Sequence, residues 1–496
     1  MDSLIERIGK YAFYYPERIA AIDEMKELTY KELNEKVNQW FRYFEVSGMN
    51  SKHPVMIYMN NTVSYIEVLL ALIKINANII PLNTQYKKED IEFLWNKNPG
   101  AFFISDHSVC EDLENSAKIN NVTLIAVEKS YRDVKNQTQK EPDSRLEFSS
   151  PLIFFTSGTT GIPKGILVQP DSFFLKIHPD YFRDHTEYIL VTRPLFFRSH
   201  LTLAVSVLQE GKTLVLSESN SNEKTWLLCD KYSINQLISG PLGITSFLDW
   251  IEANNKKFPE TLETIMTTGS PISYTLKERL MVKAPHSSFI DFYGTSEVGG
   301  ISFIDESEWL EKHGSVGMPS FFVKCLILDE TGKELPTGEV GEICIDSPHT
   351  MEGYLNDLEN NQTFFGDYIR TGDYGYIDFR GYLYLKGREQ DRINHGGFHF
   401  YSTEVEDYII DVPNVKEVVV LGKKCSNYGQ RPIAYVVFDA SNETKETLIN
   451  MIKQSIKALP SFKKPVYFHA LPTIPLTAAG KPDREKLLSL EENELR

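Results

Sequence analysis

Short apolar runs alternate with amphipathic segments through the first two thirds of the chain. Residues 54–59 and 78–81 are almost wholly apolar, which predicts buried strands, and residues 65–75 between them carry apolar positions at helical spacing. A further helix is predicted to begin at Thr29, because Glu32 follows it in the order typical of a capping box. Strands that alternate with helices indicate βαβ units, so we predict largely parallel sheets that are covered by helices on both faces.

The pattern changes near residue 323. Residues 323–328 and 341–345 are strand-like and are separated by turn residues, which predicts an antiparallel arrangement. After about residue 387, a compact closing segment again mixes helix and strand patterns. We therefore predict an α/β fold in two domains: residues 1–387 as a large N-terminal domain of mostly parallel, helix-covered sheets with a small antiparallel subdomain, and residues 388–496 as a small α+β C-terminal domain.

Composition excludes some classes of function. The chain has 496 residues, more than one ordinary core needs, and its formal net charge of −16 argues against a nucleic-acid partner. Its five cysteines are scattered and form no Cys-x-x-Cys pair, which argues against a disulfide framework or a zinc site. The N-terminus is acidic, unlike a signal peptide, and the most apolar stretch, residues 68–81, is interrupted by Lys74 and too short for a membrane span. We expect a cytoplasmic protein.

The segment richest in chemistry is residues 156–165, here called the phosphate loop. It follows an apolar strand and holds four hydroxyls, three glycines and Lys164. Glycines let successive backbone N–H groups converge on an anion, while hydroxyls and a lysine add donors and charge. The spacing is not that of a Walker A motif. A flexible polar turn between two strands is the alternative interpretation.

The phosphate loop resembles the signature of the adenylate-forming superfamily, which comprises acyl- and aryl-CoA ligases, adenylation domains and luciferases. Four more segments resemble motifs of that superfamily, and they occur in the same order: residues 293–297, 368–373, 387–391 and 475–484. The resemblance implies that ATP activates a carboxylic acid as acyl-AMP with release of pyrophosphate. The acyl group then passes to a thiol, while the small domain rotates about a hinge. Gln390 stands at the hinge position, where the family usually has Asp or Lys.

The resemblance also implies roles for individual residues. Lys481 is expected to be catalytic together with Thr156, Lys164 and Glu297, because bringing two anions together requires cations and oriented donors. Glu297 is the expected Mg²⁺ ligand, as a hard oxygen donor beside substrate phosphates. The nucleotide is expected to contact Thr156, Ser157, Gly158, Thr159, Thr160, Gly161, Lys164, Gly269, Ser270, Pro271, Asp291, Phe292, Tyr293, Gly294, Thr295, Ser296, Asp373, Arg388 and Lys481. Each residue also has an ordinary structural interpretation, such as a turn-forming Asp373 or a core Tyr293.

The acid is expected to lie against Phe197, Arg198, His200, Gly294 and Gly299. Many acyl-CoA ligases of the family have His where Phe197 stands, and domains that activate α-amino acids usually have Asp nearby. Neither is present, which disfavours an α-amino acid. Arg198 and His200 are candidates to recognise a polar or anionic group, and an exposed loop pair is an equally good interpretation. Phe197 suggests an apolar wall.

The thiol acceptor is either coenzyme A or the phosphopantetheine arm of an acyl carrier protein. His395, Gly396 and Gly397 are the expected lining of a thiol tunnel, with Lys423 and Lys424 as candidates to meet the charged nucleotide of coenzyme A. A non-catalytic nucleotide-binding protein on the same fold is a third hypothesis. The joint presence of Lys481, Glu297 and Asp373 argues against it.

Overall fold

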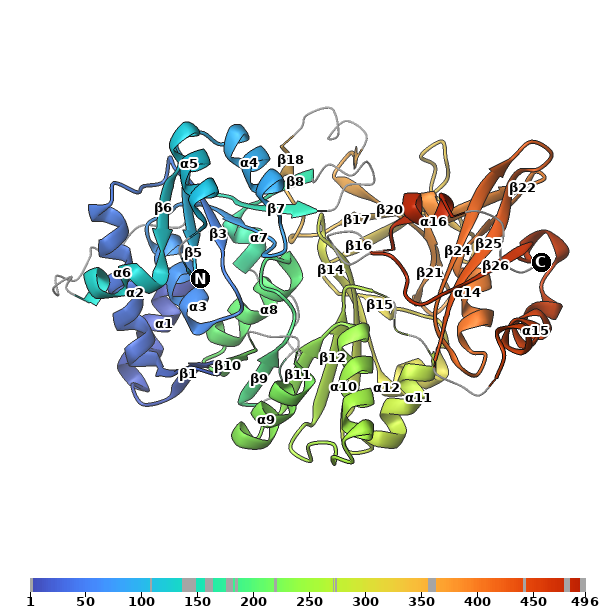
Figure 1. The fold of residues 1–496 in the computed structure, drawn as a ribbon, viewed down its shortest axis with the longest axis horizontal. Helices are drawn as coiled ribbons and strands as arrows, with labels where there is room; N and C mark the ends of the chain where they lie inside the picture. The colour runs from blue at the N-terminus through green and yellow to red at the C-terminus, as the bar shows by residue number, and fades with distance from the viewer. Residues whose placement is uncertain are drawn as a thin grey trace.

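The computed structural model describes residues 3–107, 109–135, 149–156, 164–174, 182, 186–217, 221–270, 272, 274–355, 363–439, 443–476 and 482–490. In these residues the strands form four sheets, which are numbered here in the order of their description. Figure 1 shows the arrangement, with the C-terminal sheet at one end of the molecule.

The first sheet has the strand order β15-β14-β13-β12-β11-β9-β10-β1-β2. Its central pairings, from β1 to β13, are parallel, and antiparallel strands lie at its two edges. The bounds are β1 Ile19–Ile22, β2 Glu27–Thr29, β9 Tyr188–Val191, β10 Thr213–Leu216, β11 Gln236–Ser239, β12 Thr264–Thr268, β13 Ser288–Thr295, β14 Gly299–Asp305 and β15 Met318–Pro319.

The second sheet has the order β18-β8-β7-β4-β3-β5-β6 and is parallel from β7 to β6. Its bounds are β3 Pro54–Tyr58, β4 Asn78–Pro81, β5 Phe102–Ser105, β6 Thr123–Ala126, β7 Leu152–Thr156, β8 Lys164–Val168 and β18 Gly353–Tyr354. The antiparallel pairing of β7 with β8 brings the two ends of the phosphate loop together, since Thr156 is the partner of Lys164.

The third and fourth sheets are smaller. The third is antiparallel and contains β16 Lys324–Leu328, β17 Gly341–Asp346, β19 Phe364–Phe365, β20 Tyr368–Ile377 and β21 Leu383–Arg388. The fourth contains β22 Arg392–His395, β23 Phe398–Tyr401, β24 Val415–Cys425, β25 Gly429–Phe438 and β26 Tyr467–Leu471, of which β26 runs parallel to β25.

Helices cover both large sheets, as the alternating sequence pattern predicts. The helical bounds are α1 Leu4–Tyr14, α2 Tyr30–Val46, α3 Val63–Lys74, α4 Lys88–Lys97, α5 Glu111–Ile119, α6 Val127–Lys135, α7 Pro170–Phe174, α8 Arg198–Gln209, α9 Asn222–Tyr232, α10 Pro241–Ala253, α11 Tyr274–Lys283, α12 Glu306–Glu311, α14 Thr403–Ile410, α15 Lys445–Ser455 and α16 Arg484–Leu488, with short 3₁₀ turns at η1 Glu389–Asp391, η2 Ile456–Ala458 and η3 Ser461–Lys463.

The main hydrophobic core lies between the two large sheets. It contains α2, α3 and α8, whose buried faces pack against strands of both sheets. A second cluster under α9, α10 and α11 covers the other face of the first sheet, and a third under α4 and α5 covers the second sheet (Figure 1). The fourth sheet has its own core beneath α14 and α15. Among the described residues, no helix is both long enough and apolar enough to cross a bilayer.

Candidate active site

Three of the predicted nucleotide residues meet in one hydrogen-bonded cluster. Asp373 on β20 accepts a 2.7 Å hydrogen bond from the Tyr293 hydroxyl and a 2.9 Å ion-paired bond from Arg388 Nε. Asp373 as a whole residue is only 7% exposed. Burial, together with the negative charge of Asp373, raises the pKa of Tyr293, so the phenol stays protonated and donates. A carboxylate has further acceptor positions after these two bonds, and ribose hydroxyls are suitable donors for them.

Glu297 lies in the turn between β13 and β14 and is connected through Tyr354 to Lys164. Its Oε1 accepts a 3.0 Å hydrogen bond from the Tyr354 hydroxyl, and the ring of Tyr354 lies 5.5 Å from Lys164 Nζ. Tyr354 belongs to β18, which pairs with β8, so it connects the edge of the second sheet to the end of the first. The expected metal ligand and the expected phosphate lysine are therefore held by one tyrosine. Local sequence gave no signal for Tyr354.

Arg198 does not lie on an exposed loop. It begins α8, its guanidinium is buried, and it donates to the backbone carbonyls of Ser296 and His349. Burial lowers its pKa to about 10, against the opposing effect of Glu297, so the side chain remains charged at neutral pH. The arginine therefore fixes the turn that carries Glu297.

Asp291 is also held by protein groups. Its side chain accepts a 2.8 Å hydrogen bond from Thr267 and lies 3.9 Å from Lys277 Nζ. Burial raises the pKa of Asp291 and lowers that of Lys277 to about 8. These contacts fix β13 against β12 and α11, which positions the strand that carries Tyr293.

Gly294 and Gly299 face each other across the β13–β14 hairpin. A Cβ at Gly294 would overlap the carbonyl of Gly299, and Gly299 has a φ of +72°. Both positions therefore require glycine for the hairpin to close. Phe292 on β13 is buried among core residues. Thr295 Oγ1 accepts a long hydrogen bond from Val298 N, and the carbonyl of Ser296 accepts one from Arg198.

Phe197 and His200 stand at the start of α8 with their rings 6.0 Å apart. His200 is 1% exposed, its Nδ1 lies 3.1 Å from Ser199 Oγ, and its Nε2 has no hydrogen-bond partner. Burial, with a contribution from Arg193, lowers the pKa of His200 to about 3, so the imidazole is neutral. Arg193, which the sequence analysis missed, stacks on the Phe197 ring at 5.4 Å.

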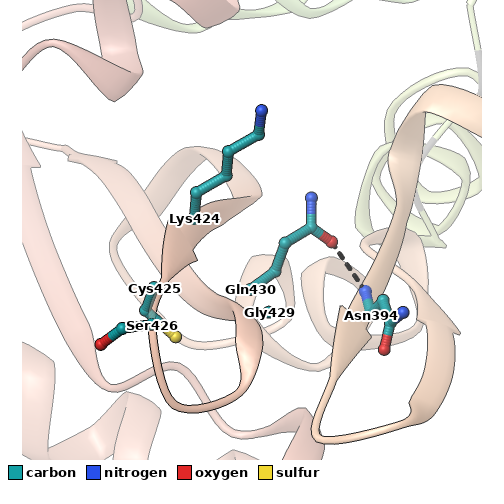
Figure 2. A pocket seen from close by; sticks show the side chains of 6 residues that line it. All are labelled: Asn394, Lys424, Cys425, Ser426, Gly429 and Gln430. Carbon is teal, nitrogen blue, oxygen red and sulfur yellow. Dashed lines mark hydrogen bonds between the residues drawn. The ribbon is translucent and has the colours of Figure 1, made fainter.

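The tunnel loop, residues 395–397, is the turn between β22 and β23. His395 stacks on Tyr428 at 4.9 Å and its Nδ1 lies 2.7 Å from the carbonyl of Gln430, while Gly396 and Gly397 both have positive φ. A cavity of about 620 Å³ borders this loop. Figure 2 shows its lining, with a hydrogen bond from Asn394 N to Gln430 Oε1 and with Lys424 reaching away from the strand; the lining residues are Asn394, Lys424, Cys425, Ser426, Gly429 and Gln430.

Of the remaining predicted residues, some lie in the described part of the chain and others do not. Gly269, with a φ of +94°, and Ser270 follow the carboxyl end of β12, and the backbone of Thr156 ends β7. The predicted residues outside the described part of the chain are Ser157, Gly158, Thr159, Thr160, Gly161, Pro271 and Lys481.

The small fourth sheet and the nucleotide cluster are joined near the hinge. Arg484, at the start of α16, donates to the carbonyl of Gln390 at 2.9 Å and forms an ion pair with Asp391. Burial and the nearby charge of Arg388 lower the pKa of Arg484. Because Arg388 also binds Asp373, the segment that follows Lys481 lies close to the expected ribose site.

Comparison with known proteins identifies the family. Residues 10–355 match the family model described as AMP-binding enzyme, and residues 404–481 match the AMP-binding enzyme C-terminal domain. The chain belongs to the AMP-binding enzyme family. Both matches fall on segments to which the sequence motifs assign nucleotide chemistry.

Relatives in the family share the full length of the chain. A 2-succinylbenzoate–CoA ligase from Geobacillus kaustophilus is 27% identical over 99% of this chain and 98% of its own. The o-succinylbenzoate CoA synthetase of Bacillus subtilis, bound to its acyl-adenylate, superposes with a TM-score of 0.87 at 25% identity and 99% coverage of both chains. The same enzyme with ATP and magnesium gives a TM-score of 0.85, at 25% identity and 97% and 98% coverage. These relatives confirm the predicted fold class and the class of AMP-forming acid–thiol ligases.

One further structure of that Bacillus subtilis enzyme bears on the arrangement of the chain. A double mutant bound to a product analogue superposes with a TM-score of only 0.71, at 24% identity and 99% coverage of both chains. The overall arrangement here is thus nearer to that of the acyl-adenylate complex. This agrees with the position of Arg484 beside the nucleotide cluster.

Proposed function

We propose that this protein activates a carboxylic acid with ATP as an acyl-adenylate, and then transfers the acyl group to coenzyme A. The observation that carries the proposal is the cluster of Tyr293, Asp373 and Arg388. These residues come from three separate motifs, and their side chains bond to one another. A chain that had kept only the fold would have no need to retain this arrangement.

Each part of the site has a role in the proposal. Asp373 binds the ribose, Tyr293 lies beside the adenine, and the phosphate loop with Lys164 holds the triphosphate. Mg²⁺ fits beside Glu297, whose carboxylate is a hard oxygen donor. No group of three possible metal ligands occurs in the described residues, so phosphate oxygens and water would complete its coordination. Lys481 approaches the α-phosphate and the reacting carboxylate and reduces their repulsion.

The site also supports coenzyme A as the acceptor. The nucleotide part of coenzyme A is anionic. Lys424 lines the cavity beside the tunnel loop, where this nucleotide would pass (Figure 2). Lys423, by contrast, turns its Nζ toward the carbonyl of Leu490. Residues 1–387 and 388–496 are proposed as the two domains that move between the half-reactions. A cytoplasmic location is part of the same proposal and suits the five free cysteines.

The test is ATP–pyrophosphate exchange with a panel of acids: 2-succinylbenzoate, anthranilate, benzoate and fatty acids of several lengths. We expect exchange with one class of acid, and coenzyme A should then release AMP and form the thioester. Lys481→Ala should slow exchange by at least about 100-fold, because a positioned charge near the developing transition state is lost.

The matched control is Lys457→Ala, which removes an exposed lysine from the same part of the chain and should leave exchange unchanged. If ATP binds but no acid supports exchange, the enzyme assignment fails. If Lys481→Ala exchanges as well as the wild type, the catalytic lysine is wrongly assigned.

A further inference from the structure

Arg193 lies at the carboxyl ends of the parallel strands of the first sheet. It follows β9, and its guanidinium extends across the carboxyl end of β11 toward β12, which are consecutive strands of that sheet. A Cβ at Gly240, just after β11, would overlap Arg193 Nη1, and one at Gly269, just after β12, would lie 3.9 Å from Nη2. Ligands of parallel sheets bind outside the carboxyl ends of the strands.

The backbone of Arg193 is fixed, while its charge is not neutralised. Asn61 Nδ2 donates to the Arg193 carbonyl at 2.7 Å, and Asn61 Oδ1 accepts from Leu195 N at 2.9 Å. The guanidinium itself rests on the Phe197 ring, and no ion pair with a carboxylate is found for it among the described residues. Burial lowers the pKa of Arg193, which means that the protein shields this cation from water without supplying a counter-ion.

Two neighbouring groups also favour an anion. Helix α10 begins at Pro241 with Gly240 as its N-cap, and no side chain caps its first N–H groups, so the positive end of the helix dipole lies beside Arg193. The ring of His200 lies 6.0 Å from that of Phe197, and His200 is buried with an unpartnered Nε2. A neutral imidazole that interacts with Ser199 through Nδ1 can donate from Nε2.

We infer that the acid substrate carries a second anionic group, a carboxylate, and that Arg193 binds it, with His200 as an additional donor. The substrate class is therefore a dicarboxylic acid, held on an apolar wall formed by Phe197. This inference rests on the proposed function. The proposed function assigns the phosphates and the reacting carboxylate to Lys164 and Lys481, which leaves Arg193 for a separate anion.

The experiment compares 2-succinylbenzoate, the dicarboxylic acid of the panel, with its two monoesters, in which one carboxylate at a time is blocked. Wild-type enzyme should prefer the diacid, in kcat/KM for pyrophosphate exchange, by on the order of 10- to 100-fold over the monoester that keeps the reacting carboxylate. Arg193→Gln should remove that preference and leave the activity with this monoester unchanged. Arg380→Gln, at an exposed arginine far along the chain, is the matched control and should keep the preference.

Gly240→Ala is a second variant that keeps the charge. Its backbone φ of −93° accepts alanine, while the new Cβ displaces the guanidinium, so the preference for the diacid should also fall. The inference is overturned if wild type prefers monocarboxylic acids, or if Arg193→Gln slows diacid and monoester equally. Failure of every acid to support exchange would instead contradict the proposed function.

Discussion

At the scale of single residues, two arginines near the start of α8 differ in what their guanidinium groups contact. The sequence predicts that Arg198 contacts the acid, because Arg198 follows Phe197, near which the acyl-CoA ligases and the amino-acid-activating domains of the family differ. In the structure Arg198 is buried and bonds two backbone carbonyls, while Arg193 has a charge that no described carboxylate neutralises. Local sequence cannot separate the two cases, since the partners of Arg198 are 98 and 151 residues away.

Arg198 should accordingly be important for stability. Arg198→Met leaves the carbonyls of Ser296 and His349 without donors in a buried site, so we expect the free energy of unfolding to fall by about 2–4 kcal/mol. Urea denaturation measures this change. The ratio of kcat/KM values for diacid and monoester should stay as in the wild type. A stable variant with an altered ratio would show that Arg198 contacts the acid after all.

The predictable part of the site is the part carried by motifs. Tyr293, Glu297, Asp373 and Arg388 were each marked by the few residues around them, and the structure brings them into one region. No sequence motif surrounds Tyr354, because the pairing of β18 with β8 alone brings it to the site. The contacts that join Arg484 to the hinge are likewise visible only after folding.

At the scale of elements, apolar patterns predicted most of the strands and helices. Thr29 caps α2 with Glu32 in the expected box, and β3 and β4 lie within a residue or two of their predicted bounds. The apolar runs 188–191 and 213–216 also predict strands, and they form β9 and β10. In the C-terminal domain, the apolar spacing of residues 445–459 predicts a single helix, which is too long: α15 ends at Ser455 and η2 follows. Helical apolar spacing continues through the 3₁₀ turn, so the pattern cannot locate this change.

Helix α14 is attached to β24 through a carboxylate whose environment gives a test of pH dependence. Glu406 accepts a 2.7 Å bond from Val420 N, and burial raises the pKa of Glu406 to about 7 from 4.5. The folded protein therefore holds this proton more tightly than the unfolded chain. The contribution of Glu406 to stability is largest at low pH and is lost as the pH rises from about 4.5 to about 7.

Glu406→Gln should therefore raise the free energy of unfolding by about 1–2 kcal/mol at pH 8, and by much less at pH 5. Glutamine keeps an oxygen that can accept from Val420 N without the buried charge. Urea denaturation at both pH values measures the difference. Glu446→Gln, on the exposed side of α15, should show no such pH-dependent gain. Equal effects at the two pH values would contradict the burial argument.

At the scale of the whole molecule, a short chain of charges connects the third sheet to the C-terminal part of the chain. Arg484 binds Asp391 and the carbonyl of Gln390, and Arg388 in the same turn binds Asp373. These contacts hold the fourth sheet over the nucleotide cluster, in an arrangement nearer to the relative's acyl-adenylate complex. The rotation that the family makes between half-reactions turns about the hinge at Gln390, so it would change the backbone whose carbonyl Arg484 binds.

Arg484→Gln should thus change one half-reaction more than the other. Pyrophosphate exchange should fall about three- to tenfold, because the charge-assisted contacts that favour the adenylating arrangement are weakened. Thioester formation from a supplied acyl-adenylate should be unchanged or faster. Arg380→Gln should alter neither rate. Equal loss in both half-reactions would indicate general damage to the domain and not a shift between arrangements.

The strand order of the first sheet has a practical consequence for protein engineering. Arg193, Gly240 and Gly269 follow three consecutive parallel strands, whereas Tyr293, Asp373 and Arg388 lie on the hairpin beyond them and on the third sheet. A combinatorial library confined to positions 193, 197, 200 and 240 would therefore sample new acids while the adenylating machinery stays constant. Selection for thioester formation with a chosen acid could then redirect this ligase in a single round of diversification.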